Sequence, residues 1–164
     1  MSKKFWKDLE SGKFALMVKE SSRGQKLQSS KQVYNIMKPM FAEKDDVETM
    51  YVIFMTAKND IISIEKMFSG SISSTMVYPR EIVKKTLELK AAAIAMVHNH
   101  PSGDVTPSPE DLGITRRVAL AMACIGATLH DHIIIGDGYH SMADTDFIGS
   151  RIKLEIDTIF NGGY

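Results

Sequence analysis

Residues 95–114 read AMVHNHPSGDVTPSPEDLGI, and this stretch decides the fold that we expect. It continues a short strand, because AAIAMVH at 92–98 is apolar up to its final histidine. Pro101 cannot donate a hydrogen bond to a sheet, so the chain must leave the sheet directly after the strand. Ser108, followed by a proline and two acidic residues, fits the first turn of a helix that extends to about residue 126. A buried strand, a loop and a helix are therefore expected in succession.

The segments before this unit predict a helix and a hairpin. Ser29 and Gln32 fit a capping box for a first amphipathic helix at about 30–42, which Pro39 should kink or end early. Two runs rich in β-forming residues, TMYVIFM and IISIEKMF, are joined by the turn residues AKND and predict an antiparallel pair.

Two more elements complete the expected domain. YPREIVKKTLELK at 78–90 predicts a helix with proline in its first turn, and its expected buried face consists of Ile82, Val83, Thr86 and Leu87. HIIIG at 132–136 predicts another strand, which ends at a turn over DGYH. We expect residues 1–28 to form a flexible N-terminal arm and residues 29–164 to form one domain.

Composition limits the classes of protein. The chain has 164 residues, of which 44% are hydrophobic, and this is enough for one domain with a sizeable core. Its 20 basic and 20 acidic residues give no net charge, so the electrostatic footprint of a dedicated nucleic-acid binder is missing. The single cysteine, Cys124, excludes an intramolecular disulfide, and we expect it to have a packing role in a protein from a reducing compartment. Apolar runs fall short of the ~18 residues that span a bilayer, so we expect a cytoplasmic protein without membrane association.

The segment after the buried strand contains candidate metal ligands. Alternate side chains of a strand share a face, so His98 and His100 should point toward the same ion. Asp111, in the first turn of the following helix, could be the third ligand, with the fourth position left to water. Spacing alone leaves another interpretation open, because the helix dipole favours an aspartate there without any metal.

The residues HNHPSGD at 98–104, followed by Pro107, Ser108 and Asp111, resemble the signature of the RadC family. The domain of that family belongs to the JAB/MPN metalloprotease-like group, which carries the JAMM motif, and the resemblance extends over roughly residues 30–148. It implies an α/β (α+β) fold of the cytidine-deaminase-like, MPN type, with a mixed sheet flanked by helices in a single domain. Longer RadC proteins carry a helix-hairpin-helix region ahead of this domain. Only about 30 residues precede it here, so we do not expect the DNA-binding role that the family's name would bring.

The resemblance also implies the parts of a catalytic site. They are a Zn²⁺ held by His98, His100 and Asp111, a water in the fourth position, and an upstream glutamate as general base. In JAMM proteins the base lies at the start of the strand that follows the first helix, and this position selects Glu48. Glu81 is the alternative base. Each glutamate also has a plain explanation, Glu48 as a surface residue that ends an acidic loop and Glu81 as a complement to the helix dipole.

Two further motifs have more than one interpretation. Ser108 could fix the helix as its N-cap, and the resemblance gives it a hydrogen bond to the oxyanion of a tetrahedral intermediate. HDH at 130–132 could form a second metal site, but we expect Asp131 and His132 to serve packing or hydrogen bonding behind the zinc ligands.

Three functions remain. The first, which we favour, is a zinc-dependent metallohydrolase that cleaves a peptide or isopeptide bond in a protein or peptide substrate. The second is a DNA-repair or mobile-element accessory protein that contacts nucleic acid, and the absence of net charge opposes it. The third is a non-catalytic MPN-like interaction scaffold, which is disfavoured because three ligands, Ser108 and a candidate base are all present.

Overall fold

A mixed five-stranded sheet forms the centre of the molecule, and its strand order is β2-β1-β3-β4-β5. The computed structural model describes residues 11–41, 46–70 and 78–162. β3 runs parallel to β4 and antiparallel to β1, and both outer pairs of strands are antiparallel. The strands are β1 (Thr49–Met55), β2 (Ile61–Ser69), β3 (Ala93–Asn99), β4 (Thr128–Ile135) and β5 (Tyr139–Ser141).

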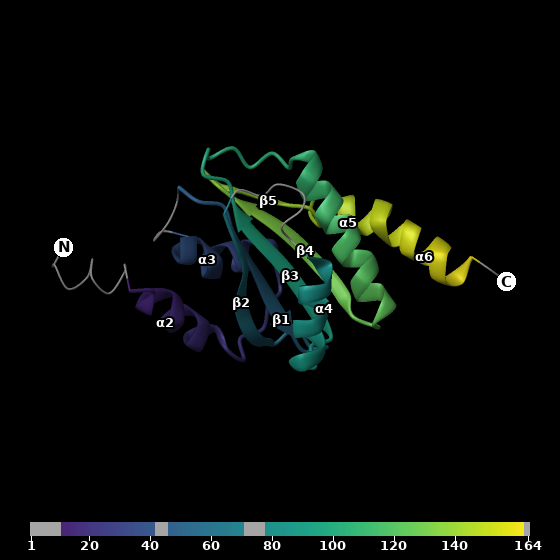
Figure 1. Ribbon diagram of the computed structural model, residues 1–164, viewed down its shortest axis with the longest axis horizontal. Helices are drawn as coiled ribbons and strands as arrows, with labels where there is room; N and C mark the ends of the chain where they lie inside the picture. The colour runs from purple at the N-terminus through teal and green to yellow at the C-terminus, as the bar shows by residue number, and fades with distance from the viewer. Residues whose placement is uncertain (1–10, 42–45, 71–77, 163–164) are drawn as a thin grey trace.

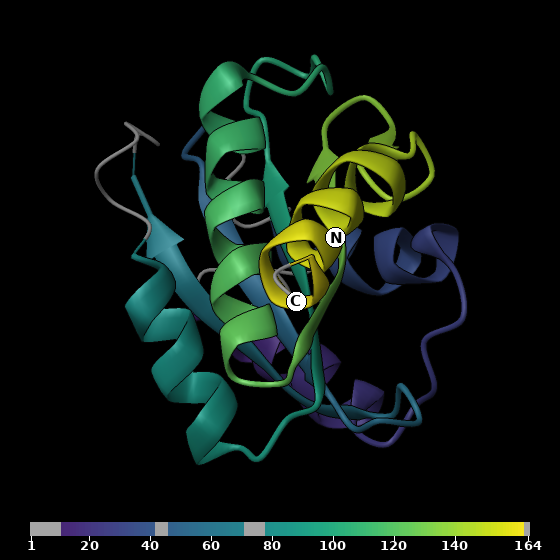
Figure 2. The same cartoon turned by 90° about the vertical axis from the view of Figure 1, so that its right-hand side faces the viewer.

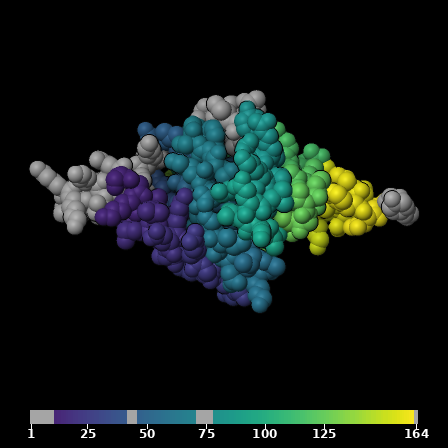
Figure 3. All heavy atoms as spheres, turned by 60° about the horizontal axis from the view of Figure 1, so that its bottom comes forward, coloured from purple at the N-terminus to yellow at the C-terminus, as the bar shows by residue number. Residues whose placement is uncertain are grey.

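Helices cover both faces of this sheet (Figure 1, Figure 2). One face carries α2 (Lys13–Ser22) and α3 (Ser30–Phe41), and the other carries α4 (Pro79–Glu88) and α5 (Pro109–Cys124). A π-helical turn, η1 (Phe147–Ile152), follows β5 and leads into α6 (Lys153–Asn161). In the space-filling view, α2 in purple and α6 in yellow lie toward opposite ends of the molecule (Figure 3).

The neighbouring strands β1 and β3 are buried along their whole length, and their side chains contribute to two separate hydrophobic cores, one on each face of the sheet. Odd-numbered residues of β1 and β3, such as Ile53 and Val97, pack on the side of α3. Even-numbered residues, such as Val52 and Met96, pack on the side of α4 and α5. Because side chains alternate along a strand, His98 points to the same side as Met96, toward α5.

This architecture confirms the predicted fold class, a mixed sheet flanked by helices. The first helix, the hairpin and the strand before Pro101 lie where they were predicted, and α5 begins directly after Ser108. Pro39 lies inside α3, two residues before the helix ends at Phe41. The Ser29 hydroxyl accepts the Gln32 N–H as expected, but the Gln32 side chain accepts the N–H of Gln28 and not that of Ser29.

The region expected to be a flexible arm contains a helix in its described part. α2 occupies much of it, and the chain that follows is bonded to the turn before β2 and to the start of that strand. Gly24 N–H donates to the Ile61 carbonyl at 2.8 Å, and Leu27 N–H donates to the Asn59 carbonyl at 2.9 Å. Residues 1–10 lie outside the described residues.

Other differences concern burial and the chain after Gly136. On α4, Ile82 and Thr86 are buried as predicted, but Leu87 is 57% exposed because it lies beyond the stripe that faces α5. Cys124 is exposed instead of packed in the core. Tyr139 and His140 belong to β5, although the sequence predicts a turn there. Among the described residues, no helix is long and apolar enough to cross a membrane.

Candidate metal centre and its cleft

The side chains of His98, His100 and Asp111 converge at the end of β3. Nε2 of His98 lies 3.1 Å from one carboxylate oxygen of Asp111, and Nε2 of His100 lies 3.3 Å from the other. The two Nε2 atoms are 3.0 Å apart. One ligand atom from each of the three residues falls within a group no wider than 4.8 Å. The structure thus brings together the three residues that the sequence predicts as metal ligands.

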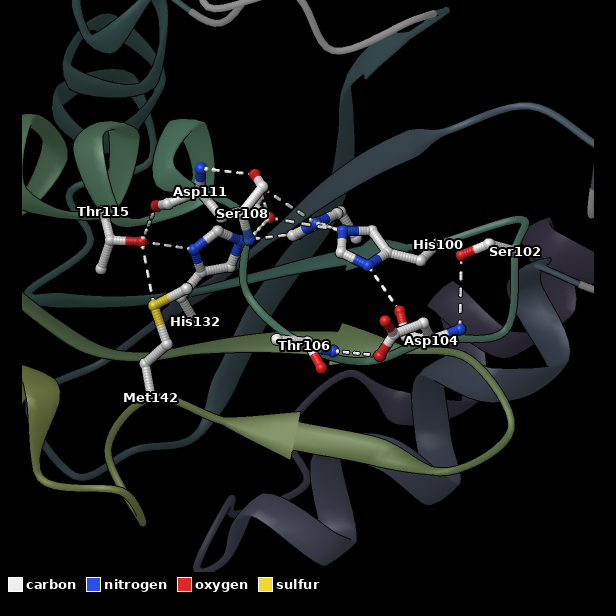
Figure 4. A network of polar contacts seen from close by, with 10 residues as sticks. His100, Ser102, Asp104, Thr106, Ser108, Asp111, Thr115, His132 and Met142 are labelled. Carbon is white, nitrogen blue, oxygen red and sulfur yellow. Dashed lines mark hydrogen bonds and ion pairs between the residues drawn. The ribbon is translucent and has the colours of Figure 1, made fainter.

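His100 is held by the loop that follows it. Its Nδ1 lies 2.7 Å from the carbonyl oxygen of Asp104 (Figure 4). Because a carbonyl can only accept, Nδ1 must carry a proton, and in the neutral imidazole Nε2 then keeps its lone pair for a ligand. The Asp104 carboxylate accepts the Thr106 N–H at 2.9 Å, which is a hydrogen bond within its own turn.

Asp111 is fixed by the first turn of α5. The Ser108 hydroxyl accepts the Asp111 N–H, and the Asp111 side chain accepts the Ser108 N–H, so the two residues form a capping box. The Ser108 hydroxyl also donates to the Asp111 carboxylate at 2.7 Å. Ser108 is therefore confirmed as the N-cap, and the carboxylate cannot rotate freely away from the histidines.

The charges of this group reinforce one another. Burial alone would raise the pKa of the Asp111 carboxyl, but its polar contacts with His100, His98 and Ser108 hold it well below its usual range. The hydrogen bond to Asp111 raises the pKa of His100 against the opposing effect of burial, and the negative charge of Glu48 adds to this rise. Asp111 is consequently ionised at neutral pH, as a metal ligand must be.

A cleft of about 660 Å³ opens over these residues. Glu48 is half-buried directly before β1 and lines this cleft together with His100 and Asp111. The other lining residues are Asp46, Val47, Gly70, Pro101, Ser102, Ser108 and Glu110. The predicted base therefore shares the cleft with two of the predicted ligands, His100 and Asp111, and the third, His98, is buried behind them.

Hydrogen bonds hold the backbone on both sides of Glu48. The Asn99 side chain accepts the Thr49 N–H at 2.7 Å and donates to the Val47 carbonyl at 3.2 Å. The Glu48 carbonyl accepts the Gly70 N–H at 2.9 Å. Asn99 lies between the two candidate histidine ligands in sequence, so the same strand end positions both ligands and the segment that carries Glu48.

Glu81, the alternative base, lies elsewhere. It is exposed in the first turn of α4, and its carboxylate lies 3.2 Å from Nε of Arg80. Glu81 does not belong to the described residues that line the cleft. The geometry thus favours Glu48 over Glu81.

The HDH motif contributes one residue to the surroundings of the centre. His132 is fully buried, and its Nε2 lies 2.8 Å from Nδ1 of His98. Burial and the nearby His98 lower the pKa of His132 well below its ordinary value. His130 points away to Asn59, at 2.9 Å. Within the described parts of the chain, His98, His100 and Asp111 are the only group placed to hold an ion, so the second metal site is not formed.

Sequence reasoning missed two residues of this site, Thr115 and Asn99. Thr115 lies one helical turn after Asp111, and its hydroxyl reaches His132 at 2.5 Å. The spacing of four residues from Asp111 was the available signal, because it places both side chains on one face of α5. Asn99 gave no such local signal, since its partners lie 50 and 52 residues away.

Comparisons with known proteins agree with this geometry. Residues 27–147 match the family described as the RadC-like JAB domain. A UPF0758 protein from Methanosarcina mazei is 40% identical over 124 residues, which are 75% of this chain and 54% of that protein. A UPF0758 protein from Actinobacillus pleuropneumoniae serotype 5b is 42% identical over 106 residues, which are 64% of this chain and 48% of that protein.

The chain spans about half the length of these curated relatives. The matched family segment nevertheless covers most of the chain and contains Glu48, Ser108 and all three candidate ligands. The chain therefore belongs to the RadC-like JAB domain family.

Proposed function

We propose that this chain is a zinc-dependent hydrolase of the RadC-like JAMM class that cleaves a peptide or isopeptide bond in a protein or peptide substrate. The observation that carries the proposal is the convergence of His98, His100 and Asp111 at one side of a cleft that also contains Glu48. A hydrolase needs an activated water and a proton acceptor beside it, and this arrangement supplies residues for both.

The donor set fits zinc. Two imidazole nitrogens and one carboxylate are ligands that zinc accepts, and three protein ligands leave a position open for chemistry. Asp111 is ionised, and the Asp104 carbonyl fixes His100 with its Nε2 lone pair toward Asp111. When bound, zinc would supply Lewis acidity, which lowers the pKa of water to about 7 and polarises a carbonyl oxygen.

The chain's own residues would carry the proton. Glu48 would take a proton from the attacking water as the water oxygen bonds to the carbonyl carbon, and would return it to the nitrogen as the carbon–nitrogen bond breaks. Ser108 would donate to the developing oxyanion. Its hydroxyl proton is directed to Asp111 here, so the hydroxyl must rotate to serve the substrate. We place this activity in the cytoplasm, where the lone cysteine, Cys124, would remain reduced.

Metal analysis tests the first half of the proposal. Protein purified without chelator should contain stoichiometric zinc, and His100→Ala should reduce it to background. His130→Ala is the matched control, because this histidine lies outside the centre and bonds to Asn59. Circular dichroism should show that both variants are folded. Zinc that survives His100→Ala, or is lost with His130→Ala, would contradict the ligand set.

Turnover tests the second half. The zinc-loaded chain should hydrolyse members of a set of fluorogenic peptides and lysine isopeptide conjugates, and His100→Ala should not. A chain that binds zinc stoichiometrically but cleaves no member of either set would favour the non-catalytic scaffold. Salt-dependent binding to DNA in place of turnover would favour the accessory role in nucleic-acid metabolism.

A further inference from the structure

A row of buried polar contacts runs from the candidate metal centre into the core (Figure 4). Nδ1 of His98 lies 2.8 Å from Nε2 of His132, and Nδ1 of His132 lies 2.5 Å from the hydroxyl of Thr115. That hydroxyl lies 2.5 Å from the backbone carbonyl of Asp111. None of His98, His132 and Thr115 is exposed, so water cannot substitute for any member of the row.

The far end of the row determines where the protons lie. The Asp111 carbonyl can only accept, so Thr115 is the donor in this contact. The sulfur of Met142 also lies 3.2 Å from this hydroxyl, but it too is only an acceptor. Whichever of the two takes the proton, the Thr115 oxygen is left to accept from His132.

The remaining protons follow from this starting point. His132 must carry its proton on Nδ1 to donate to Thr115, so its Nε2 has a lone pair. That lone pair accepts from His98, which must carry its proton on Nδ1. Nε2 of His98, the atom that faces Asp111 at 3.1 Å, then keeps its lone pair. In the opposite arrangement, Thr115 would donate its proton to Nδ1 of His132. The lone pairs of the Thr115 hydroxyl oxygen and the Asp111 carbonyl oxygen would then face each other in the core.

We propose that His132 and Thr115 are positioning residues that fix the tautomer of His98, so that its Nε2 presents a lone pair to a metal ion. The inference rests on the proposed function to the extent that it takes Nε2 of His98 as a metal ligand. His100 obtains the same tautomer directly from the Asp104 carbonyl. His98 obtains this tautomer through the side chains of His132 and Thr115, and Thr115 belongs to α5, the helix that also contains Asp111.

The spacing of Asp111 and Thr115 gives α5 two tasks. Its first turn presents a carboxylate to the ion, and its second turn presents a hydroxyl that sets the proton on a strand histidine. Partners behind a metal-bound histidine typically contribute 10–100-fold to metal affinity or activity, and we expect roughly this range here.

Thr115→Val tests the proposal, because valine keeps the shape and removes the hydroxyl. His132 then has no acceptor for a proton on Nδ1 and takes the Nε2–H form, which drives His98 away from its ligand tautomer. We expect zinc affinity, measured by competition with a chromophoric chelator, to fall roughly 10–100-fold. Thr115→Ser keeps the hydroxyl and should bind zinc like the parent chain. Equal affinities of the valine and serine variants would overturn the proposal.

NMR of the imidazole rings reports which nitrogen of His98 carries the proton, and a merely structural role of Thr115 would not change this position. Long-range proton–nitrogen spectra of the metal-free protein should show His98 with its proton on Nδ1, and in Thr115→Val with its proton on Nε2. A parent chain in which His98 already carries the proton on Nε2 would overturn the proposal. This spectrum does not depend on turnover, so a chain that hydrolyses nothing would contradict the proposed function and leave this inference standing.

A second pair of variants guards against misfolding of Thr115→Val. His132→Gln can place an amide oxygen where Nε2 accepts from His98, whereas His132→Leu fills the space without an acceptor. We expect the glutamine variant to retain more zinc affinity than the leucine variant when thermal melting shows both to be folded. The opposite order, or equal affinities, would contradict a role through His98.

Discussion

Glu48 lies directly before β1, and the register of the sheet explains why it lines the same cleft as His100. Met50 pairs with His98 in the antiparallel ladder, and continuing this register by two residues places Glu48 opposite His100. Its negative charge contributes to the raised pKa of His100, which agrees with this placement. Glu48 thus lines the cleft with His100 and Asp111 but does not belong to the group that is placed to hold an ion.

Glu48→Gln should therefore separate metal binding from turnover. Glutamine is nearly isosteric with glutamate but cannot take a proton, so activity on any substrate found should fall by about 10²–10⁴-fold while zinc content stays level. Steady-state kinetics together with metal analysis of the same preparation make the measurement.

Glu81→Gln is the matched control for this variant. Glu81 is exposed and pairs with Arg80 on α4, so its loss should leave both activity and zinc unchanged. Undiminished turnover in Glu48→Gln, with a loss in Glu81→Gln, would reverse the assignment of the base.

The three candidate ligands could be predicted from the sequence because their geometry is local. Strand alternation places His98 and His100, and the helix start places Asp111, over a span of 14 residues counted from 98 to 111. The surroundings of the ligands were less accessible. His132 contacts His98 across 34 residues, and Asn99 contacts Thr49 across 50, and these pairs meet only because β3 lies between β1 and β4.

Asn99 connects the end of β3 to the chain that enters β1, and its loss should be costly. The residue is buried, and Asn99→Ala leaves the Thr49 N–H without its acceptor. We expect the free energy of unfolding, from urea denaturation, to fall by about 1–3 kcal/mol. Asn35→Ala, at an exposed position of α3, should change it by no more than about 0.5 kcal/mol. If the two variants were equally stable, the Asn99 bonds would not hold this segment.

Elements whose pattern depends on distant partners were predicted less well. The helix α2 has a half-polar sequence, and it is stabilised by packing against α3 and β2 that no local pattern reveals. The short strand β5 exists because β4 offers it a partner edge from Ile133 to Ile135. Leu87 fits the apolar face of α4 by spacing, yet it is exposed. Ile82 and Thr86 are the buried residues of this helix, and the Thr86 hydroxyl contacts the sulfur of Met122 in α5 at 3.7 Å. Tertiary packing decides such cases.

The whole fold directs negative charge toward one opening. The chain has no net charge, yet Asp46, Glu48 and Glu110 line the cleft together with Asp111. Among the described residues that line it, no lysine or arginine opposes them. A cation in this cleft therefore relieves repulsion that the folded chain otherwise sustains, and its binding should stabilise the whole molecule.

Zinc should accordingly raise the melting temperature. An ion that binds only the folded state at 100 times its dissociation constant adds about 2.7 kcal/mol, which corresponds to a rise of roughly 5–11 °C for a domain of this size. The local reason lies in the two Nε2 atoms of His98 and His100, which lie 3.0 Å apart beside the Asp111 carboxylate, so that one ion could contact all three residues. Thermal melting of chelator-treated protein, before and after zinc is added, measures the shift, and renewed chelation should reverse it. His100→Ala should show almost no shift, whereas a shift of the same size in that variant would place the stabilising ion outside this centre.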